Sequence, residues 1–219
     1  MKKVIFLDAG HGGIDPTGAY ASQPDNMFNH REGIFHYNSI FYEGFKNREY
    51  CDLIKKKLSA EGITVIPVYH PYKDTRVQDR VHIANWYHVN ICPGIYISEH
   101  SNATTNHEAQ GFQIWTSKGN KESDKHGDVL LDLYEKKFEM EEYLIEDDID
   151  DDILKLLTDY NDEDRDYEAN FYILHKTRMP TILLENLFFD NFEDASILME
   201  KWYRDKYTDL IVEWVKKII

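Results

Sequence analysis

The chain opens with VIFLDAGHGG (Val4–Gly13), in which four consecutive apolar residues lead to an aspartate and then to a histidine among three glycines. Two later stretches repeat this arrangement, IYISEHSNA (Ile95–Ala103) and MPTILLEN (Met179–Asn186). In each stretch a short apolar run, typical of a buried strand, leads to a histidine or a glutamate. Open α/β sheets bind ligands at the carboxyl ends of their strands, so we expect these side chains to share one site.

The segments between these strands alternate between helical and extended patterns. Apolar residues recur at helical spacing before and after a β-branched run, and again at the end of the chain. The predicted helices are about Glu43–Ala60, Arg76–His88, Glu168–Lys176 and Glu193–Ile218, and the predicted further strands are Ile63–Val68 and Gly111–Thr116. Residues 20–40 are predicted to form an irregular loop. The alternation predicts an α/β fold, a three-layer α/β/α domain with a mostly parallel twisted sheet.

Length and charge restrict the class of protein. With 219 residues, we expect a single domain over residues 1–219. The formal net charge of −15 argues against a nucleic-acid partner and against electrostatic docking on anionic lipid or wall polymer. No apolar run approaches the roughly 20 residues that cross a bilayer. We therefore expect a monomer with no membrane anchor.

A strongly acidic segment interrupts the pattern. Residues 120–165 are predicted to be an acidic helical insertion that includes EDDIDDD (Glu146–Asp152). A solvated charged face is the favoured interpretation. A calcium loop is the alternative, but the run lacks the glycine and the closing glutamate of an EF-hand loop.

The N-terminus and the cysteines indicate where the chain is made. The apolar part of the N-terminus ends after four residues at Asp8, so it is predicted to be a strand and not a signal peptide. Cys51 and Cys92 do not form a CxxC pair, and two reduced thiols are expected.

The three strand-associated side chains suit different tasks. His11 and His100 are flanked by small residues, which keep both imidazoles accessible, whereas strand alternation directs Glu99 to the opposite face. Glu185 follows an apolar run, so burial should raise the pKa of its carboxyl group and suit it to general acid–base catalysis. A structural ion pair of Glu185 with Arg178 or Arg165 is the alternative.

A third metal ligand is needed, because catalytic zinc sites have three protein ligands and one open position. Glu43 is the best candidate, at the start of a predicted helix, with Asn47 one turn further along the same face to hold its carboxylate. A carboxylate that only stabilises the helix dipole is the alternative for Glu43. Glu32 and Glu49 are the nearby alternative ligands.

The ordered set of motifs resembles a known family, the zinc-dependent N-acetylmuramoyl-L-alanine amidases of the amidase-3 type, which occur in bacterial cell-wall hydrolases and phage endolysins. The matching stretches are Asp8–Pro16, Glu43 with Asn47, Arg80–Asn85, Ser98–Ala103, Gly111–Phe112, Ala169–Leu174, Met179–Glu185 and Asn191. The resemblance covers nearly the whole chain except the 20–40 loop and the acidic segment. Two departures are Thr17–Ala19 after Pro16 and Asn186–Phe188 after Glu185, of which the second could reshape a substrate groove.

The resemblance implies one zinc ion bound by His11, Glu43 and His100, with Glu185 as the catalytic carboxylate. It implies hydrolysis of the amide bond between N-acetylmuramic acid and L-alanine in peptidoglycan. The alternatives are a zinc peptidase acting within the stem peptide and a non-catalytic peptidoglycan-binding module. His175 and Arg165 are second-rank candidates for holding the peptide or the oxyanion, although a surface or ion-paired role is favoured for both.

The sequence also leads to an expectation about where the protein is made and where it acts. Without a signal peptide or a wall-binding repeat, the chain is expected to be an endolysin that is synthesised in the cytoplasm and acts on the cell wall after release. A housekeeping wall hydrolase exported by another route is the alternative.

Overall fold

A computed structural model gives the fold of the chain and describes residues 4–20, 34–36, 39–138, 154–160 and 164–219. Six strands form one sheet in the order β4-β1-β5-β8-β6-β7. Their bounds are β1 Val4–Ala9, β4 Val65–Pro67, β5 Gly94–Asn102, β6 Gln113–Thr116, β7 Tyr167–Glu168 and β8 Thr181–Phe188. Neighbouring strands are parallel except β6 and β8, which are antiparallel. The predicted mostly parallel sheet is therefore confirmed.

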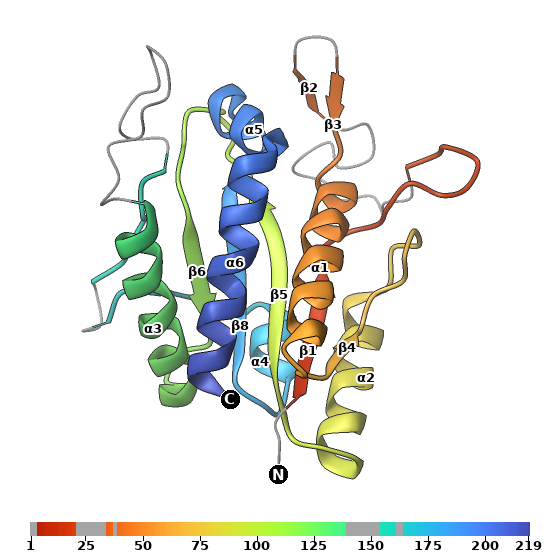
Figure 1. The fold of residues 1–219 in the computed structure, drawn as a ribbon, viewed down its shortest axis with the longest axis vertical. Coiled ribbons are helices and arrows are strands. Elements are labelled where there is room, and N and C mark those ends of the chain that lie inside the picture. Colours follow the sequence, from red (N-terminus) through yellow and green to blue (C-terminus); the bar gives the residue numbers. More distant parts are fainter. Residues whose placement is uncertain (1–3, 21–33, 37–38, 139–153, 161–163) are drawn as a thin grey trace.

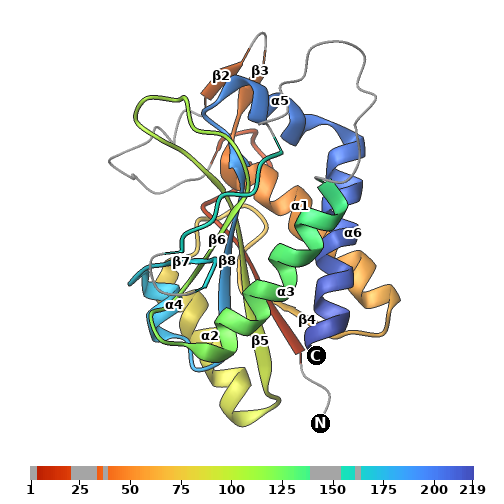
Figure 2. The same ribbon diagram turned by 90° about the vertical axis from the view of Figure 1, so that its left-hand side faces the viewer.

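Helices cover both faces of the sheet (Figures 1 and 2). On one face lie α1 (Glu43–Ala60), α3 (Lys121–Phe138) and α6 (Lys201–Ile218), with α5 (Phe192–Met199) preceding α6. On the other face lie α2 (Val77–Asn90) and α4 (Tyr172–Lys176). This confirms the three-layer α/β/α architecture. None of the helices in the described ranges is long and apolar enough to cross a bilayer.

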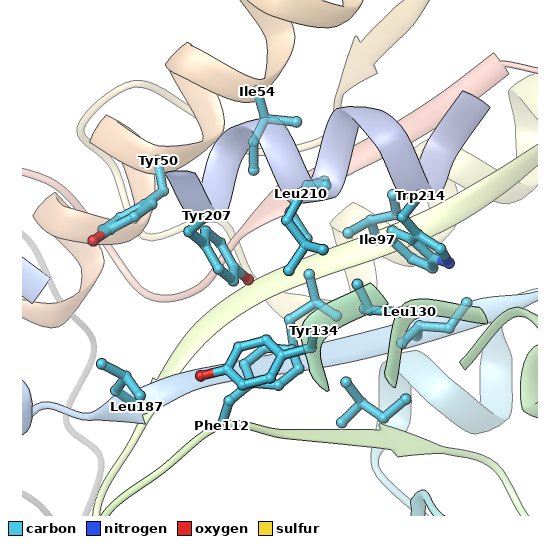
Figure 3. Close-up of a cluster of buried hydrophobic side chains, with 14 of the residues drawn as sticks. Tyr50, Ile54, Ile97, Phe112, Leu130, Tyr134, Leu187, Tyr207, Leu210 and Trp214 are labelled. Atoms are coloured by element: carbon cyan, nitrogen blue, oxygen red, sulfur yellow. The ribbon is translucent and has the colours of Figure 1, made fainter. Parts of the chain in front are cut away.

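The main core lies between the sheet and the layer that contains α6 (Figure 3). In α6 the buried apolar and aromatic residues recur at helical spacing: Tyr203, Tyr207, Leu210, Ile211, Trp214, Val215 and Ile218. Phe112 stacks on Tyr134 of α3 with ring centroids 4.4 Å apart. The Trp214 indole N–H, which burial would otherwise leave unsatisfied, donates to the His126 carbonyl at 2.8 Å.

Two strands extend further than their apolar runs suggest. β5 continues through His100 to Asn102, and β8 continues through Glu185 to Phe188, so both side chains lie within strands instead of at their ends. A register shift between His100 and Asn102 marks where the β5–β8 pairing becomes irregular. Backbone pairing continues past the apolar residues because it does not depend on the polarity of the side chain.

Three local predictions were wrong. The helix expected over Glu168–Lys176 is shorter, because Glu168 belongs to β7 and α4 begins only at Tyr172. The single helix expected over Glu193–Ile218 is interrupted at Glu200, whose extended backbone (φ −72°, ψ 134°) ends α5 and begins α6. Within the expected irregular loop, Ile34–His36 (β2) and Ser39–Phe41 (β3) pair as a two-stranded antiparallel sheet.

The predicted acidic insertion begins with a helix that packs on the main core. Leu130, Leu131 and Tyr134 of α3 are fully buried there. The run Glu146–Asp152 lies outside the described residues, so neither its solvated character nor its calcium-loop alternative is tested. The insertion and the single-domain boundary stay predictions. Cys51 and Cys92 are free thiols.

Candidate metal centre

The structure brings together the three residues predicted as metal ligands. His11 follows β1, Glu43 is the first residue of α1, and His100 lies in β5. One ligand atom from each lies within 4.8 Å of the others. The two Glu43 carboxylate oxygens face different imidazoles: Oε2 is 3.1 Å from His11 Nε2 and Oε1 is 3.3 Å from His100 Nδ1.

Hydrogen bonds fix the Glu43 carboxylate in this position. Glu43 is 2% exposed, and its Oε1 accepts from Asn47 Nδ2 at 3.1 Å and from the Ser101 backbone N–H at 3.3 Å. The Asn47 contact expected from helical spacing is therefore present. A carboxylate in the first turn of α1 also interacts favourably with the helix dipole.

The charge balance of the cluster favours a cation. Burial lowers the pKa of His100, but the hydrogen bond and negative charge of Glu43 more than offset this effect and raise that pKa to about 9. A positive charge beside Glu43, whether a proton or a metal ion, is therefore stabilised. Two imidazoles and one carboxylate are a donor set that zinc accepts. Ligands about 2.0–2.1 Å from a tetrahedral ion lie about 3.3 Å from one another, and the observed spacings of 3.1 and 3.3 Å fit that arrangement.

The backbone of His11 is held in an unusual conformation. Its φ of +58° lies in the left-handed region, which costs a non-glycine residue about 1–3 kcal/mol. Two buried arginines donate to its carbonyl oxygen, Arg48 Nη2 at 2.8 Å and Arg80 Nη2 at 2.9 Å. These charge-assisted bonds hold the strained turn and, with it, the imidazole.

Each arginine also connects this turn to the helix that carries it. Arg48 of α1 donates to the carbonyls of Gly10 and Gly44. Arg80 of α2 donates to the Ala9 carbonyl at 2.6 Å and forms a buried ion pair with Asp8 at 2.7 Å. The turn is thus fixed to α1 and α2 at once.

Asp8 is the centre of a second buried polar network. Its Oδ2 accepts hydrogen bonds from Tyr96 and Ser98 of β5, both at 3.0 Å. Burial raises the pKa of Asp8, but the charges of Arg80 and His100 and the hydrogen bonds from Arg80 and Tyr96 outweigh burial, and the net pKa is lowered. Asp8 therefore remains ionised and orients Arg80.

Two glycines permit the close packing around the imidazoles. A Cβ on Gly10 would lie 2.2 Å from Cε1 of His100, and a Cβ on Gly44 would lie 2.0 Å from the Gly12 carbonyl oxygen. Any larger residue at either position would displace a ligand-bearing segment.

Glu185 lies beside the cluster. It pairs with His100 across the parallel strands β5 and β8, so both side chains project from the same face of the sheet. Burial raises the pKa of Glu185 to about 8, with His100 lowering it and Glu43 raising it further. Its Oε2 is buried and has no hydrogen-bond partner among the described residues.

A cleft of about 620 Å³ opens over His11, His100 and Glu185. Its walls come from the residues before and at the start of α2 and α4. They are Asp74, Thr75, Arg76, Val77, Phe171, Tyr172 and Ile173, with Asp8, Arg80 and Leu183 below. An extended polar substrate could therefore reach Glu185 and the cluster from one side.

The other candidates lie elsewhere. Glu49 pairs with Lys46 at 2.7 Å, and Arg165 bonds to Asp132 and Glu135 of α3, which is the ion-paired role favoured for it. Glu32 lies outside the described ranges. His175 is exposed and is not among the cleft-lining residues.

Glu99 faces away from the cluster, as strand alternation predicts. It is fully buried and accepts hydrogen bonds from Tyr207 at 2.9 Å and Asn186 at 3.1 Å.

Sequence reasoning assigned no role to Arg48 or Arg80. Both lie on the buried face of an amphipathic helix, Arg48 three residues before buried Cys51 and Arg80 three residues after Val77. An arginine on such a face must be paired, because burying an isolated charge is costly. That spacing was the available signal.

Known proteins share this sequence pattern and fold. A family model described as N-acetylmuramoyl-L-alanine amidase matches residues 5–217. The endolysin of Bacillus phage SPP1 is 26% identical over 227 residues, covering 100% of this chain and 67% of that protein. The amidase LytC of Bacillus subtilis is 26% identical over 212 residues, covering 95% of this chain and 34% of that protein. A crystal structure of N-acetylmuramoyl-L-alanine amidase from Clostridium difficile 630 has a TM-score of 0.71 at 21% identity, covering 99% of this chain and 96% of that one.

Proposed function

The chain belongs to the N-acetylmuramoyl-L-alanine amidase family, and from this premise we propose how its site hydrolyses the amide bond between N-acetylmuramic acid and L-alanine in peptidoglycan. His11, Glu43 and His100 hold one zinc ion, and Glu185 is the catalytic carboxylate. The observation that carries this proposal is the arrangement of Glu185 in register with His100, beside the three clustered donors and in the same cleft.

The zinc ion, when bound, supplies a Lewis acid that polarises the scissile carbonyl and makes water a stronger nucleophile. The residues around the site orient the proposed zinc ligands. Glu43 is held by Asn47 and Ser101, and His11 is held by the two arginines that bind its carbonyl. The donors are thus preorganised and do not have to be ordered when substrate binds.

Glu185 moves the proton. Its buried Oε2 takes a proton from the attacking water and then donates it to the leaving amine of L-alanine. A raised pKa suits both steps, because the carboxylate is then basic enough to accept the proton and acidic enough to return it. With zinc bound, His100 would be a neutral ligand, and the positive charge that opposes the rise in the Glu185 pKa would come from the ion.

Peptidoglycan is the substrate, and the chain acts on it as a monomer. Similarity to a phage endolysin supports a lytic role, in which the protein reaches the cell wall after release from the cytoplasm. The formal net charge of −15 favours contact with a short substrate segment over electrostatic docking along an extended anionic polymer.

Mass analysis of products from purified peptidoglycan tests the proposal. The expected products are free stem peptides with an L-alanine N-terminus, and a zinc chelator should abolish them. Cleavage inside the stem peptide would instead identify a peptidase, and binding to peptidoglycan without any product would identify a non-catalytic module.

The variant Glu185→Ala separates the two roles within the site. It should bind zinc like the parent chain but release no stem peptide. Retained lytic activity in this variant would refute the role of Glu185, and lost zinc binding would reassign Glu185 as a ligand.

A further inference from the structure

A second group of acidic side chains lies on the outer part of the sheet, away from the cleft. Asp124 is in the first turn of α3, and Asp164 and Asp166 directly precede β7 (Figure 2). One carboxylate oxygen from each lies within 4.8 Å of the others. All three are ligands of oxygen type, unlike the mixed donors of the cleft.

Asp166 is the buried member of this group. It is 1% exposed, and its Oδ1 has no hydrogen-bond partner among the described residues. This oxygen would lie 3.8 Å from a Cβ placed on Gly127. Because Gly127 is three residues after Asp124 on α3, the oxygen points toward the helix face that carries Asp124. A buried carboxylate oxygen without a donor is costly unless a cation or a proton satisfies it.

Thr116 does not satisfy all of the carboxylate oxygens in this group. Its Oγ1 lies 2.6 Å from Asp166 Oδ2 and 3.1 Å from Asp124 Oδ1. A hydroxyl group has one hydrogen and can donate to only one of these oxygens. Unless a proton or a cation lies between them, the other carboxylate oxygen faces a hydroxyl lone pair at close range, which is repulsive.

Arg165 does not neutralise Asp166 either, although it is adjacent in sequence. Its guanidinium turns toward α3, where it bonds to Asp132, Glu135 and the Asp128 carbonyl. The charges of Asp164 and Asp124 add to burial in raising the pKa of Asp166 to about 7, against the hydrogen bond from Thr116.

We propose that Asp124, Asp164 and Asp166 bind a hard divalent cation, with Ca²⁺ as the preferred ion. Ca²⁺ takes carboxylate oxygens in flexible geometry and completes its six to eight ligands with water or carbonyl groups, whereas zinc favours nitrogen or sulfur donors. The ion joins the first turn of α3 to the residues that enter the edge strand β7. Its effect is on stability, so the proposal stands independently of the amidase mechanism.

Calcium titration of the full chain tests this site. The buffer is freed of divalent ions and then supplied with enough zinc to saturate the cleft, so that added Ca²⁺ reports on other sites. Isothermal titration calorimetry should detect binding with a Kd of about 1 mM or tighter. At a tenfold excess of Ca²⁺ over Kd, the Tm should rise by about 3–5 °C.

Two variants and a matched control complete the experiment. Asp166→Asn retains an acceptor for Thr116 but removes a charge, and Asp124→Asn removes a charge from a less buried position. Each should weaken Ca²⁺ binding at least tenfold. Asp132→Asn makes the same change on α3 outside the cluster and should respond to Ca²⁺ like the parent chain.

The readouts separate a metal site from a merely structural cluster. If Asp166→Asn does not fold, Asp124→Asn decides the result. The same titration with Mg²⁺ should give a weaker response. Absence of a response to both ions, or an equal response in Asp124→Asn and the parent chain, would overturn the proposal.

Discussion

The molecule holds two groups of acidic side chains close enough to share a cation, and they differ in the donors around them. In the cleft, Glu43 lies between two imidazoles and accepts hydrogen bonds from Asn47 and Ser101. At the sheet edge, Asp124, Asp164 and Asp166 face one another, with one threonine hydroxyl between two of them. Both groups concentrate negative charge, but nitrogen donors suit zinc whereas an all-oxygen set suits Ca²⁺. Donor chemistry, and not charge alone, therefore distinguishes the two proposed sites.

The largest effect is expected from a substitution that disrupts the cleft cluster and leaves the sheet-edge cluster intact. Glu43→Gln keeps the size of the side chain but loses the charge that both imidazoles face. Zinc affinity should fall at least about a hundredfold, since even residues that only orient ligands contribute 10–100-fold. Amidase turnover should fall to background. Metal analysis after dialysis and release of soluble peptidoglycan fragments measure the two effects.

The control for this prediction is Glu49→Gln on the same helix, where the glutamate pairs with Lys46 outside the cluster. It should retain zinc and activity. The rise in Tm with Ca²⁺ should survive in Glu43→Gln. Loss of both metal responses in that variant would mean that the two clusters are not independent.

A smaller effect is expected from a substitution that shifts the proposed ligand His100 without removing it. In Gly10→Ala, the new Cβ would meet the His100 ring at 2.2–2.6 Å, so the ring must shift. Misplacement of a catalytic group by about 1 Å can cost about a hundredfold in rate, so we expect turnover to fall by up to that factor. The control is Gly18→Ala in the following loop, where a Cβ would meet nothing within 4 Å but the φ of +87° strains the backbone. It tests backbone strain away from the His100 ring and should retain zinc affinity and turnover. Unchanged zinc affinity and turnover in Gly10→Ala would contradict the packing argument.

Arg48 and Arg80 support the cleft cluster because both donate to the His11 carbonyl. Arg80→Lys keeps a positive charge beside Asp8 but loses the planar fork that also binds the carbonyls of Ala9 and His11. Zinc affinity should fall about tenfold, at the low end of the range for residues that orient ligands. Arg178→Lys, an exchange at an exposed position, should bind zinc like the parent chain. An equal effect of both exchanges would show that the fork of Arg80 does not orient His11.

The last expected effect is on stability and not on metal binding, and it comes from a buried carboxylate that belongs to neither cluster. Asp194 is fully buried and accepts hydrogen bonds from the backbone N–H groups of Gly111 and Phe188. Burial raises the pKa of Asp194 to about 7, against those hydrogen bonds. The folded chain then holds a proton that the unfolded chain releases near pH 4, so stability from this group is lost as the pH rises from about 4 through 7.

Asp194→Asn should remove that dependence. The free energy of unfolding of the variant, compared with that of the parent chain, should increase between pH 5 and pH 8. Urea unfolding at several pH values measures the difference. A difference that stays constant or falls over this range would show that Asp194 is not the titrating group.

Much of the architecture followed from local patterns. The apolar runs predicted β1, β5 and β8, and helical spacing predicted α1 with its observed bounds. The helix break at Glu200 was not predicted, because the apolar stripe continues across it from Leu198 to Tyr203 and hides the extended residue. Glu185 was expected at a strand end, but strand pairing with His100 carries β8 beyond it.

Local patterns were enough to predict the layers of the fold, the face on which Glu99 lies, and the residue types available for a metal site, because periodicity and residue chemistry are local properties. Which of these residues meet depends on the tertiary packing. Glu43 reaches His11 and His100 because Gly10 and Gly44 permit close approach and because Arg48 and Arg80 bind the His11 carbonyl from two helices. Likewise, Asp124 meets Asp166 only because α3 packs beside β6. Such meetings depend on contacts between residues far apart in the chain, and local patterning does not encode those distances.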